Sequence, residues 1–445
     1  MTASLNEPAR ATTVHGDYEV VVLGGGPAGI AAATAAGRTG RSTLLIERYG
    51  FLGGMGTAAG VTNFCGLFAN VYGEHKRVVH GVADEFLDRI DKLGGLNAPH
   101  LSFSNKIQAQ AYDTSAYKVA ADDLLAAHGV KVLFHALAVG ALTEEGRVKA
   151  LFLETKQGRI AVRGECFIDC SGDGDLAAWA GAPFEKGDGH GGMLYSSMLF
   201  RIANVDPERA GRAWEIIPKL MDAAERSGSH RFPRRGAIVR PQRDPSEWRA
   251  NCTQVKRADG SPLDALDVDE LTEGEIQGRR QARDVFDFIK NNTPGFERAY
   301  IVELGPQLGV RETRRVLGTY QVSEEDVLGC VSFDDSIGVN GWPIEAHVAG
   351  DVVIKFPPIP ESRGYCQLPY RMIVPQKVDN LFVAGRCASM THDGQSAARV
   401  SGGCFVMGEA AGTAADLVLS SGAAPSQIDF GVLQKRLKAN GAFTG

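Results

Sequence analysis

One glycine-rich stretch has the spacing needed to bind the phosphates of a dinucleotide. Residues 24–29 read Gly-Gly-Gly-Pro-Ala-Gly and fit the pattern G-x-G-x-x-G. Gly24 permits a tight turn, Gly26 lets a pyrophosphate approach the backbone, and Gly29 lets the following helix pack closely on a strand. Glu47 ends an apolar stretch about 20 residues later, where a carboxylate can accept hydrogen bonds from a ribose diol. The spacing therefore predicts a dinucleotide site.

A second group of residues could bind an acidic substrate. Residues 311–315 read Arg-Glu-Thr-Arg-Arg. In a strand, alternation would send Arg311 and Arg315 to the same side, where they could hold a carboxylate through paired N–H groups. A salt-bridge cluster at the surface or at a domain interface explains the same run equally well. Both interpretations stay open at the level of the sequence.

The elements around the glycine turn are those of a buried parallel sheet. Residues 19–23 form an apolar, β-branched run, which is typical of a strand buried on both faces. An alanine-rich helix over 27–36 follows, and its N-terminal amides would face an anion. A second strand over 42–46 leads to Glu47. Strand, turn, helix, strand and acid fall in order within about 30 residues, which is far more specific than the glycine pattern alone.

Further strands and helices are predicted downstream. Residues 148–154 and 159–162 alternate like the strands of a hairpin, and 165–170 form another apolar strand. The turn over 172–177 also fits G-x-G-x-x-A, but the apolar stretch behind it is too short for a crossover helix, so we interpret it as a second edge of the first site. The glycines and alanines of a helix over about 402–420 predict close packing against the first helix or against a ligand.

The composition is that of a globular protein with two or three domains. The chain has 445 residues, 44% hydrophobic and 22% charged, which excludes a disordered or fibrous class. A net charge of -6 offers no basic face for nucleic acid. No apolar run reaches the roughly 20 residues that cross a bilayer, and no secretory signal is evident, so we expect a cytoplasmic protein without a membrane partner. The eight cysteines lack metal-ligand spacing, so no metal is expected.

Changes in composition along the chain predict a discontinuous nucleotide-binding domain. The predicted fold class is α/β, a Rossmann-type domain with an inserted mixed α+β substrate domain. The expected divisions are a flexible tail over 1–17, a nucleotide-binding domain made of 18–61, 112–182 and 368–420, a substrate or cap domain made of 62–111 and 183–367, and a C-terminal extension over 421–445.

Separated segments of the chain resemble the FAD-dependent oxidoreductase family, whose fold is shared with glutathione-reductase-type flavoproteins. The matching residues are 22–29, 46–55, 168–175, 369–386 and 408–412. The resemblance spans residues 18–420. It is specific for FAD and for the fold, whereas the family is poorly defined for substrates.

The resemblance implies which residues hold each part of FAD. The pyrophosphate would be held by Gly24, Gly26, Pro27, Ala28 and Gly29, the adenosine ribose by Glu47, and adenine by a backbone group of Val139. The flanks of the adenosine and the inner pyrophosphate would be formed by Arg48, Gly53, Gly54 and Met55, and a second edge of the site by Ser171 and Gly172, where relatives usually carry Thr-Gly. The ribityl-phosphate would lie by Gly385 and Arg386, and the flavin ring at the start of the helix at Gly402.

If the cofactor is FAD, the protein must bind a substrate and handle one proton. Histidine is the usual proton carrier near neutral pH. His392 lies in a segment that the resemblance places beside the flavin, so we expect it to be the acid or base, with a loop-orienting histidine as the alternative. Arg311 and Arg315, which match a family segment, are the other catalytic candidates. Cys65 could approach the flavin, although a buried inert thiol is the expected state, and His347 and Tyr195 are unranked candidates.

We expect a FAD-dependent enzyme that removes a hydride from a small organic substrate, as a dehydrogenase or oxidase does. The alternative within enzymes is a flavin monooxygenase or a C=C reductase, for which NAD(P)H would bind transiently because no second nucleotide fold is visible, and O2 would be a co-substrate of the monooxygenase. An electron-transfer flavoprotein subunit is an alternative of another class, and the absence of C-x-x-C motifs counts against it. A homodimer would fit the apolar loops.

Overall fold

The glycine turn belongs to a sheet of seven strands. The computed structural model describes residue 5 and residues 7–445. The strands of this sheet are β1 (Thr13–Leu23), β2 (Thr43–Ile46), β8 (Lys131–Leu133), β9 (Leu137–Glu144), β10 (Arg147–Thr155), β11 (Gly158–Asp169) and β22 (Leu381–Val383). Their order is β8-β2-β1-β11-β10-β9, and β22 pairs with β11. Four neighbouring pairs of strands are parallel: β1 with β2, β1 with β11, β2 with β8, and β11 with β22. This arrangement is the predicted α/β fold with a Rossmann-type sheet.

Two strands of this sheet are longer than the sequence indicated. β1 begins at Thr13, so residues 13–17 of the predicted flexible tail pair with β11, whereas residues 1–4 and 6 of that tail lie outside the described residues. β11 is one strand over the two segments expected at 159–162 and 165–170. This strand is continuous because it pairs with β1 along nearly its whole length. Val20, Val21 and Val22 are fully buried at the centre, as a parallel strand covered by helices requires.

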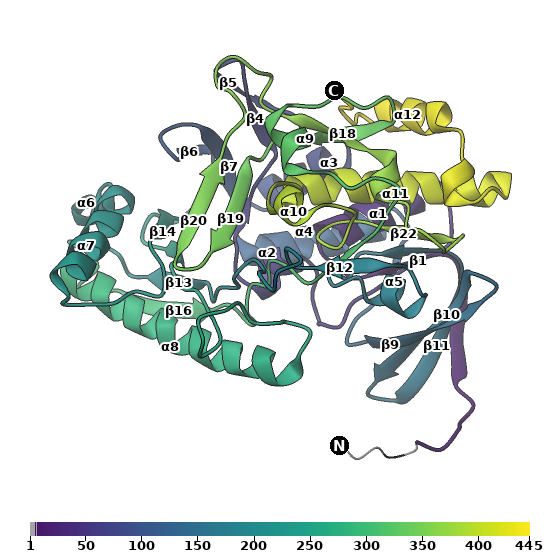
Figure 1. The fold of residues 1–445 in the computed structure, drawn as a ribbon, viewed down its shortest axis with the longest axis horizontal. Helices are drawn as coiled ribbons and strands as arrows, with labels where there is room; N and C mark the ends of the chain where they lie inside the picture. Colours follow the sequence, from purple (N-terminus) through teal and green to yellow (C-terminus); the bar gives the residue numbers. More distant parts are fainter. Residues whose placement is uncertain (1–4, 6) are drawn as a thin grey trace.

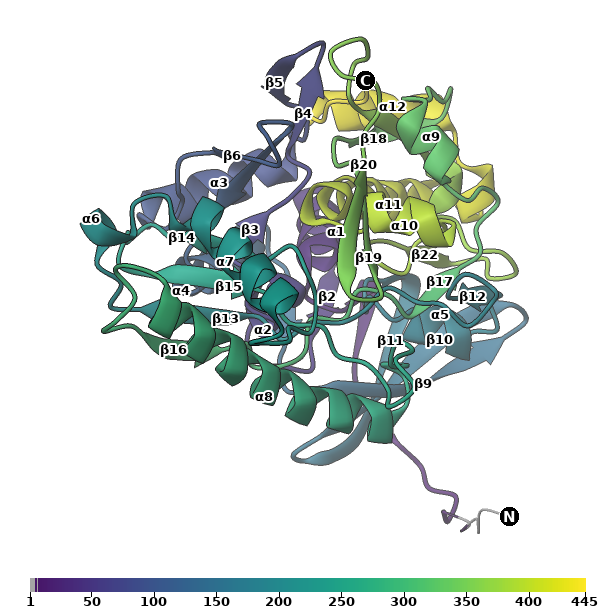
Figure 2. The same cartoon turned by 60° about the vertical axis from the view of Figure 1, so that its left-hand side comes forward.

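Two helices that are far apart in the sequence pack closely beside this sheet. They are α1 (Pro27–Arg38) and α11 (Ser401–Ser421), and Figures 1 and 2 both show them side by side. A Cβ on Gly408 would lie 2.1 Å from the carbonyl oxygen of Ala28, and a Cβ on Gly412 would lie 2.1 Å from that of Ala32. Contacts this close need glycine, and the packing offsets the roughly 1 kcal/mol that a glycine costs a helix.

A second hydrophobic core lies in the middle of the chain. Its sheet has the order β14-β15-β13-β16. The strands are β13 (Phe200–Ala203), β14 (Ile238–Pro241), β15 (Trp248–Asn251) and β16 (Tyr300–Leu304), and the helices beside them are α6 (Pro207–Ala210), α7 (Ala213–Ser227) and α8 (Val268–Asn292). The buried residues of this core extend from Met198 to Leu308 (Figure 2). They fall inside the region expected to form the substrate domain, whose boundaries stay a prediction.

The hairpin of β19 (Ile344–Val348) and β20 (Asp351–Lys355) lies between the two cores in both views (Figures 1 and 2). The remaining helices are α2 (Met55–Ala58), α3 (Val82–Lys92), α4 (Thr114–Ala127), α5 (Asp175–Trp179), α9 (Glu324–Leu328), α10 (His392–Ala398) and α12 (Phe430–Ala439). The remaining strands are β3 (Asn63–Phe64), β4 (Phe68–Val71), β5 (Glu74–Arg77), β6 (His100–Ser102), β7 (Ile107–Ala111), β12 (Phe184–Lys186), β17 (Arg314–Val316), β18 (Ser336–Asn340) and β21 (Cys366–Pro369). Across the described residues, no helix combines the length and apolar character needed to cross a membrane.

A buried carboxyl group on α11 makes the stability of the fold depend on pH. Glu409 is 3% exposed, accepts a hydrogen bond from the backbone amide of Val82 at 2.9 Å, and lies 3.6 Å from Nη1 of Arg38. Burial raises the pKa of Glu409 from 4.5 to about 7, and the hydrogen bond and the charge of Arg38 oppose that rise only in part. The folded state therefore favours the protonated carboxyl group.

We expect the free energy of unfolding to fall as the pH rises from about 4.5 to about 7. Over that range the unfolded chain gives up a proton that the folded chain retains, which favours unfolding by up to about 3 kcal/mol. Glu409→Gln removes this titration, so its stability should change less with pH and exceed that of the wild type above pH 7. Denaturant unfolding between about pH 5 and pH 8 measures both curves. Glu297→Gln, which replaces an exposed carboxylate, is the control. If the stability of Glu409→Gln and of the wild type changed with pH in parallel, Glu409 would not be the group that causes the pH dependence.

Candidate functional site

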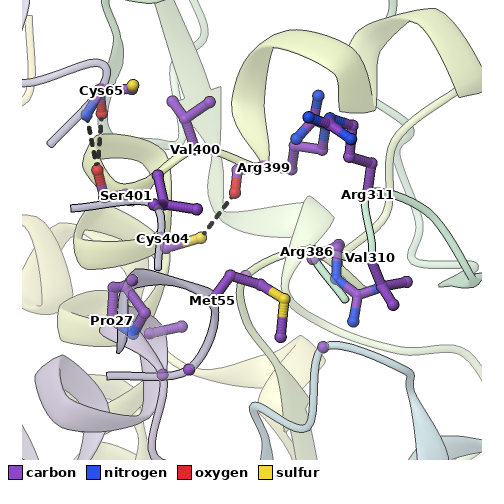
Figure 3. A pocket seen from close by; sticks show the side chains of 18 of the residues that line it. Pro27, Met55, Cys65, Val310, Arg311, Arg386, Arg399, Val400, Ser401 and Cys404 are labelled. Atoms are coloured by element: carbon purple, nitrogen blue, oxygen red, sulfur yellow. Dashed lines mark hydrogen bonds between the residues drawn. The ribbon is translucent and has the colours of Figure 1, made fainter. Parts of the chain in front are cut away.

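One cavity lies where the carboxyl ends of the parallel strands face the second core (Figure 3). Residues at the ends of β1, β2 and β11 form one part of its wall. Residues of β14, β15 and β19 form another part. Open parallel sheets bind ligands at this edge. The cavity is therefore placed to hold a nucleotide against the first sheet and a second molecule against the middle region.

The turn after β1 leaves open space at the N-terminus of α1. Gly26 is the N-cap of α1, no side chain caps this helix end, and its first turn carries no acidic residue. A Cβ on Gly26 would meet only the Cα of Gly54, at 3.8 Å. A Cβ on Gly29 would instead lie 1.8 Å from the carbonyl oxygen of Gly24, which is the close helix packing expected there. The turn thus presents backbone amides and a positive helix end to the cavity, as an anion site requires.

The Glu47 carboxylate is held in place at the end of β2. Its Oε2 accepts a hydrogen bond from the amide of Gly25 at 2.7 Å, and its Oε1 accepts one from the amide of Tyr49 at 3.0 Å. Each oxygen keeps a further lone pair for a ligand. Glu47 lines the cavity, so these pairs are available to hydroxyl groups of a bound ribose.

The turn after β11 brings a third segment to the same cavity. Asp169 accepts hydrogen bonds from the amide and hydroxyl of Ser171 at 3.0 and 2.6 Å, and from the amide of Ala177 at 2.9 Å. Arg386, just after β22, donates to Asp173 at 2.8 Å. A Cβ on Gly24 would lie 2.4 Å from the carbonyl oxygen of Cys170. The turns after β1, β11 and β22 therefore converge.

Most of the cofactor residues implied by the resemblance line this cavity. They are Gly24, Gly26, Pro27, Ala28, Glu47, Arg48, Gly54, Met55, Ser171, Gly172, Gly385 and Arg386. The others, Gly29, Gly53, Val139 and Gly402, are not among the described residues that line the cavity. Val139 belongs to β9, next to the lining residue Ala138, and the amide of Gly53 donates to the carbonyl of Gly25 at 2.8 Å.

The start of α11 is packed against the segment that carries Cys65. The amide of Gly402 donates to the carbonyl of Cys65 at 2.8 Å, and a Cβ on Gly402 would lie 2.2 Å from the carbonyl oxygen of Gly66. The hydroxyl of Ser401 accepts from the amide of Cys65 at 2.9 Å and donates to its carbonyl at 3.0 Å (Figure 3). Val400, Ser401 and Cys404 line the cavity in place of Gly402. Burial raises the pKa of the Cys65 thiol to about 12, as in an inert thiol.

Of the ranked catalytic candidates that the sequence suggested, only Arg311 lines the cavity in the described residues. Only residues 314–316 form the strand β17, so strand alternation does not bring Arg311 and Arg315 to one side. Arg315 is 2% exposed and is paired with Glu312, which matches the salt-bridge interpretation. Glu312 also lies 3.0 Å from Nδ1 of His392.

Neither Arg315 nor His392 lines the cavity in the described residues. Burial lowers the pKa of His392, but the hydrogen bond with Glu312 and its charge outweigh burial and leave this pKa raised. Glu312 therefore holds Arg315 and His392 in one buried ion-pair network beside the site. The catalytic role of His392 stays a prediction.

Two guanidinium groups from different segments face the same space. Arg311 follows the second core, and Arg399 connects α10 to α11; Figure 3 shows both in the upper part of the cavity. Nη1 of Arg311 donates to the carbonyl of Tyr195 at 2.7 Å and to Oγ of Ser197 at 2.9 Å. Burial lowers the pKa of Arg311, and the charge of Arg399 lowers it further.

A histidine and a glutamate on β19 form a hydrogen-bonded pair in the cavity wall. Glu345 and His347 share one face of the strand, with Nε2 of His347 3.1 Å from Oε1 of Glu345. Trp342 donates to the other carboxylate oxygen at 2.7 Å. Burial alone would raise the pKa of Glu345, but its bond with His347 and the charges of His347 and Arg399 hold that pKa at about 2. Burial and the charge of Arg311 lower the pKa of His347 well below its usual value.

The sequence analysis missed several of these residues. Arg249, Glu345 and Arg399 line the cavity but were not proposed, and His347 was named without a rank. The pattern Glu-Ala-His at 345–347 is a usable signal, since it places two titratable side chains on one face of a short strand. Nothing in the local sequence of Arg249 or Arg399 indicates a position at a cavity.

A family model gives the identity of the chain. The model described as FAD dependent oxidoreductase matches residues 19–437, nearly the whole chain. The chain belongs to this family. It is therefore an enzyme that uses FAD, and the open turn at Gly26, the carboxylate of Glu47 and the uncapped N-terminus of α1 fit that cofactor. No curated protein sequence matches this FAD-dependent oxidoreductase.

Solved structures share the fold of this oxidoreductase at low sequence identity. The p-nitrophenol 4-monooxygenase PnpA from Pseudomonas putida DLL-E4 is 13% identical, with a TM-score of 0.51 over 96% of this chain and 89% of that chain. A geranylgeranyl bacteriochlorophyll reductase-like protein from Thermoplasma acidophilum is 15% identical, with a TM-score of 0.47 over 95% and 82%. These are likenesses of fold. The narrower assignment to glutathione-reductase-type flavoproteins stays a prediction.

Proposed function

We propose that this FAD-dependent oxidoreductase acts on a small organic molecule through a hydroxyl group bound by His347. The supporting observation is Nδ1 of His347, which is buried in the cavity wall without a hydrogen-bond partner among the described residues. Because Nε2 is paired with the ionised Glu345, the neutral ring carries its hydrogen on Nε2 and offers Nδ1 as an acceptor. A substrate hydroxyl would satisfy this nitrogen, which is costly to leave unpaired.

His347 is suited to take the proton of that hydroxyl. Its lowered pKa keeps the ring neutral before the reaction. Glu345 orients the ring and stabilises the imidazolium that forms when Nδ1 accepts the proton. Bound FAD supplies the two-electron redox chemistry. The protein thus contributes a proton acceptor and the residues that position it.

Two reactions would use such a base. In a dehydrogenase or oxidase, His347 takes the hydroxyl proton while the carbon that bears the hydroxyl loses a hydride. In a monooxygenase, His347 takes the proton of an aromatic hydroxyl and makes the ring more electron-rich, while NAD(P)H and O2 are consumed. The fold likeness to p-nitrophenol 4-monooxygenase supports the monooxygenase better than the dehydrogenase.

Anaerobic titration of the bound flavin separates these reactions. A dehydrogenase predicts that hydroxylated compounds alone bleach the flavin absorbance. A monooxygenase predicts that NADH or NADPH bleaches it, faster with the hydroxylated compound present, and that the product formed in air carries one added oxygen atom. If no donor bleaches the flavin, the proposal is wrong and a non-catalytic FAD-binding protein is favoured.

A further inference from the structure

Among the described residues, the wall of the cavity contains three buried or half-buried arginine side chains that form no salt bridge. Arg249 and Arg311 are each 8% exposed, and Nε of Arg399 is buried. Their hydrogen bonds within the described residues go to backbone carbonyls and to one serine hydroxyl. Nε of Arg249 and Nε of Arg399 have no partner there.

Two other largely buried arginines of this chain are neutralised, whereas Arg234, which is not a lining residue of the described cavity, is buried with backbone carbonyls and Asn251 as its partners. Arg315 pairs with Glu312, and Arg386 lies 2.8 Å from Asp173. An unpaired buried cation costs folding free energy, because it gives up hydration without a compensating charge. Three such cations line one cavity, and a ligand that supplies negative charge there would explain their proximity.

We infer that the substrate is a hydroxy carboxylate, with its carboxylate between Arg311 and Arg399 and its hydroxyl donating to Nδ1 of His347. This inference rests on the proposed function, since it adds an anionic group to the hydroxyl compound. Free N–H groups on two guanidinium groups match the two oxygens of a carboxylate. The hydroxyl meets the one acceptor nitrogen that His347 leaves open.

The charges in the cavity disfavour an amino acid as the substrate. Arg249, Arg311 and Arg399 contribute positive charge, and the Glu345 carboxylate is already engaged by Trp342 and His347. An ammonium group at the position of the hydroxyl would meet these three cations, whose summed charge exceeds that of the single Glu345 carboxylate. A hydroxyl group carries no charge and avoids that repulsion.

Calorimetric binding to the FAD-loaded enzyme tests this inference. One set of probes is mandelate, mandelamide, phenylacetate and phenylglycine, and a second set is 4-hydroxybenzoate, 4-hydroxybenzamide and benzoate. The first set represents carbinol substrates and the second represents phenols. We expect a hydroxy carboxylate of one set to bind at least about 10-fold more tightly than its amide, its deoxy analogue and the amino acid.

Arg399→Gln should weaken binding of that hydroxy carboxylate by about 10- to 100-fold and leave binding of the amide unchanged. Arg283→Gln removes the same charge at an exposed site on α8 and should change neither. Arg399→Lys should restore part of the lost affinity. Because Arg399 makes no salt bridge among the described residues but its charge favours ionised Glu345, we expect Arg399→Gln without ligand to unfold at a temperature close to that of the wild type.

Three outcomes of the binding and flavin-content measurements would overturn the inference. The first is equal affinity for the carboxylates and the amides, including the case in which none binds. The second is that Arg399→Gln weakens both alike. The third is a reduced flavin content in Arg399→Gln, which would assign Arg399 to the cofactor. Neutral hydroxyl compounds that react as well as the acids would refute the anionic substrate and leave the proposed function intact, whereas loss of all flavin reduction would refute the function itself.

Discussion

Gly26→Val should fold normally and fail to retain FAD. Gly26 has φ -72° and ψ -178°, which any residue adopts, and a Cβ there meets only the Cα of Gly54 at 3.8 Å. The added side chain would point into the open space where the backbone receives the pyrophosphate. We expect FAD affinity to fall by at least about 100-fold, equivalent to about 3 kcal/mol. Flavin absorbance after gel filtration and titration of the apoprotein with FAD measure the loss.

A matched control separates cofactor loss from misfolding. Gly140 lies in β9 of the same sheet, and a Cβ there would approach only Cδ2 of Phe152, at 3.9 Å. Gly140→Ala should therefore retain FAD, and apo Gly26→Val should unfold at the temperature of the wild-type apoprotein. Stoichiometric flavin in Gly26→Val would mean that the pyrophosphate does not lie against this turn.

His347→Gln should retain FAD and lower kcat by about 100- to 10,000-fold. Glutamine can accept a hydrogen bond from a substrate hydroxyl, but it cannot take the proton, so KM should change much less than kcat. Glu345→Gln should lower kcat by a smaller factor, because it removes the charge that stabilises protonated His347. Stopped-flow measurement of flavin reduction or product formation, with the substrate found in the titrations above, reports these rates.

His392→Ala tests the competing proton carrier. If His392 is the acid or base, as the resemblance implies, the loss is about 100-fold or more. His392 contacts Glu312 and, within the described residues, does not line the cavity. We therefore expect His392→Ala to lower kcat by less than that factor. A large loss in His392→Ala together with a wild-type rate in His347→Gln would return the catalytic role to His392.

The sequence determined the nucleotide half of this protein. The run 19–47 encodes strand, turn, helix, strand and acid within a short distance, so local propensity and glycine geometry suffice to predict the α/β fold and a dinucleotide site. That the dinucleotide is FAD followed from the resemblance to the family. The close packing of α11 on α1 could also be expected, because only closely packed helices carry so many glycines. Each of these signals is contained in one short segment of the chain.

Only the tertiary structure showed which residues line the part of the cavity proposed to bind the substrate. Arg249, Arg311, Glu345, His347 and Arg399 come from different segments, and nothing in the sequence indicates that they share one cavity. The same run, 311–315, sends one arginine to the cavity and another to a salt bridge, because β17 begins only at residue 314. Whether a charged side chain forms a salt bridge depends on residues distant in the sequence. The residues available to bind a substrate can therefore be identified only in the folded chain.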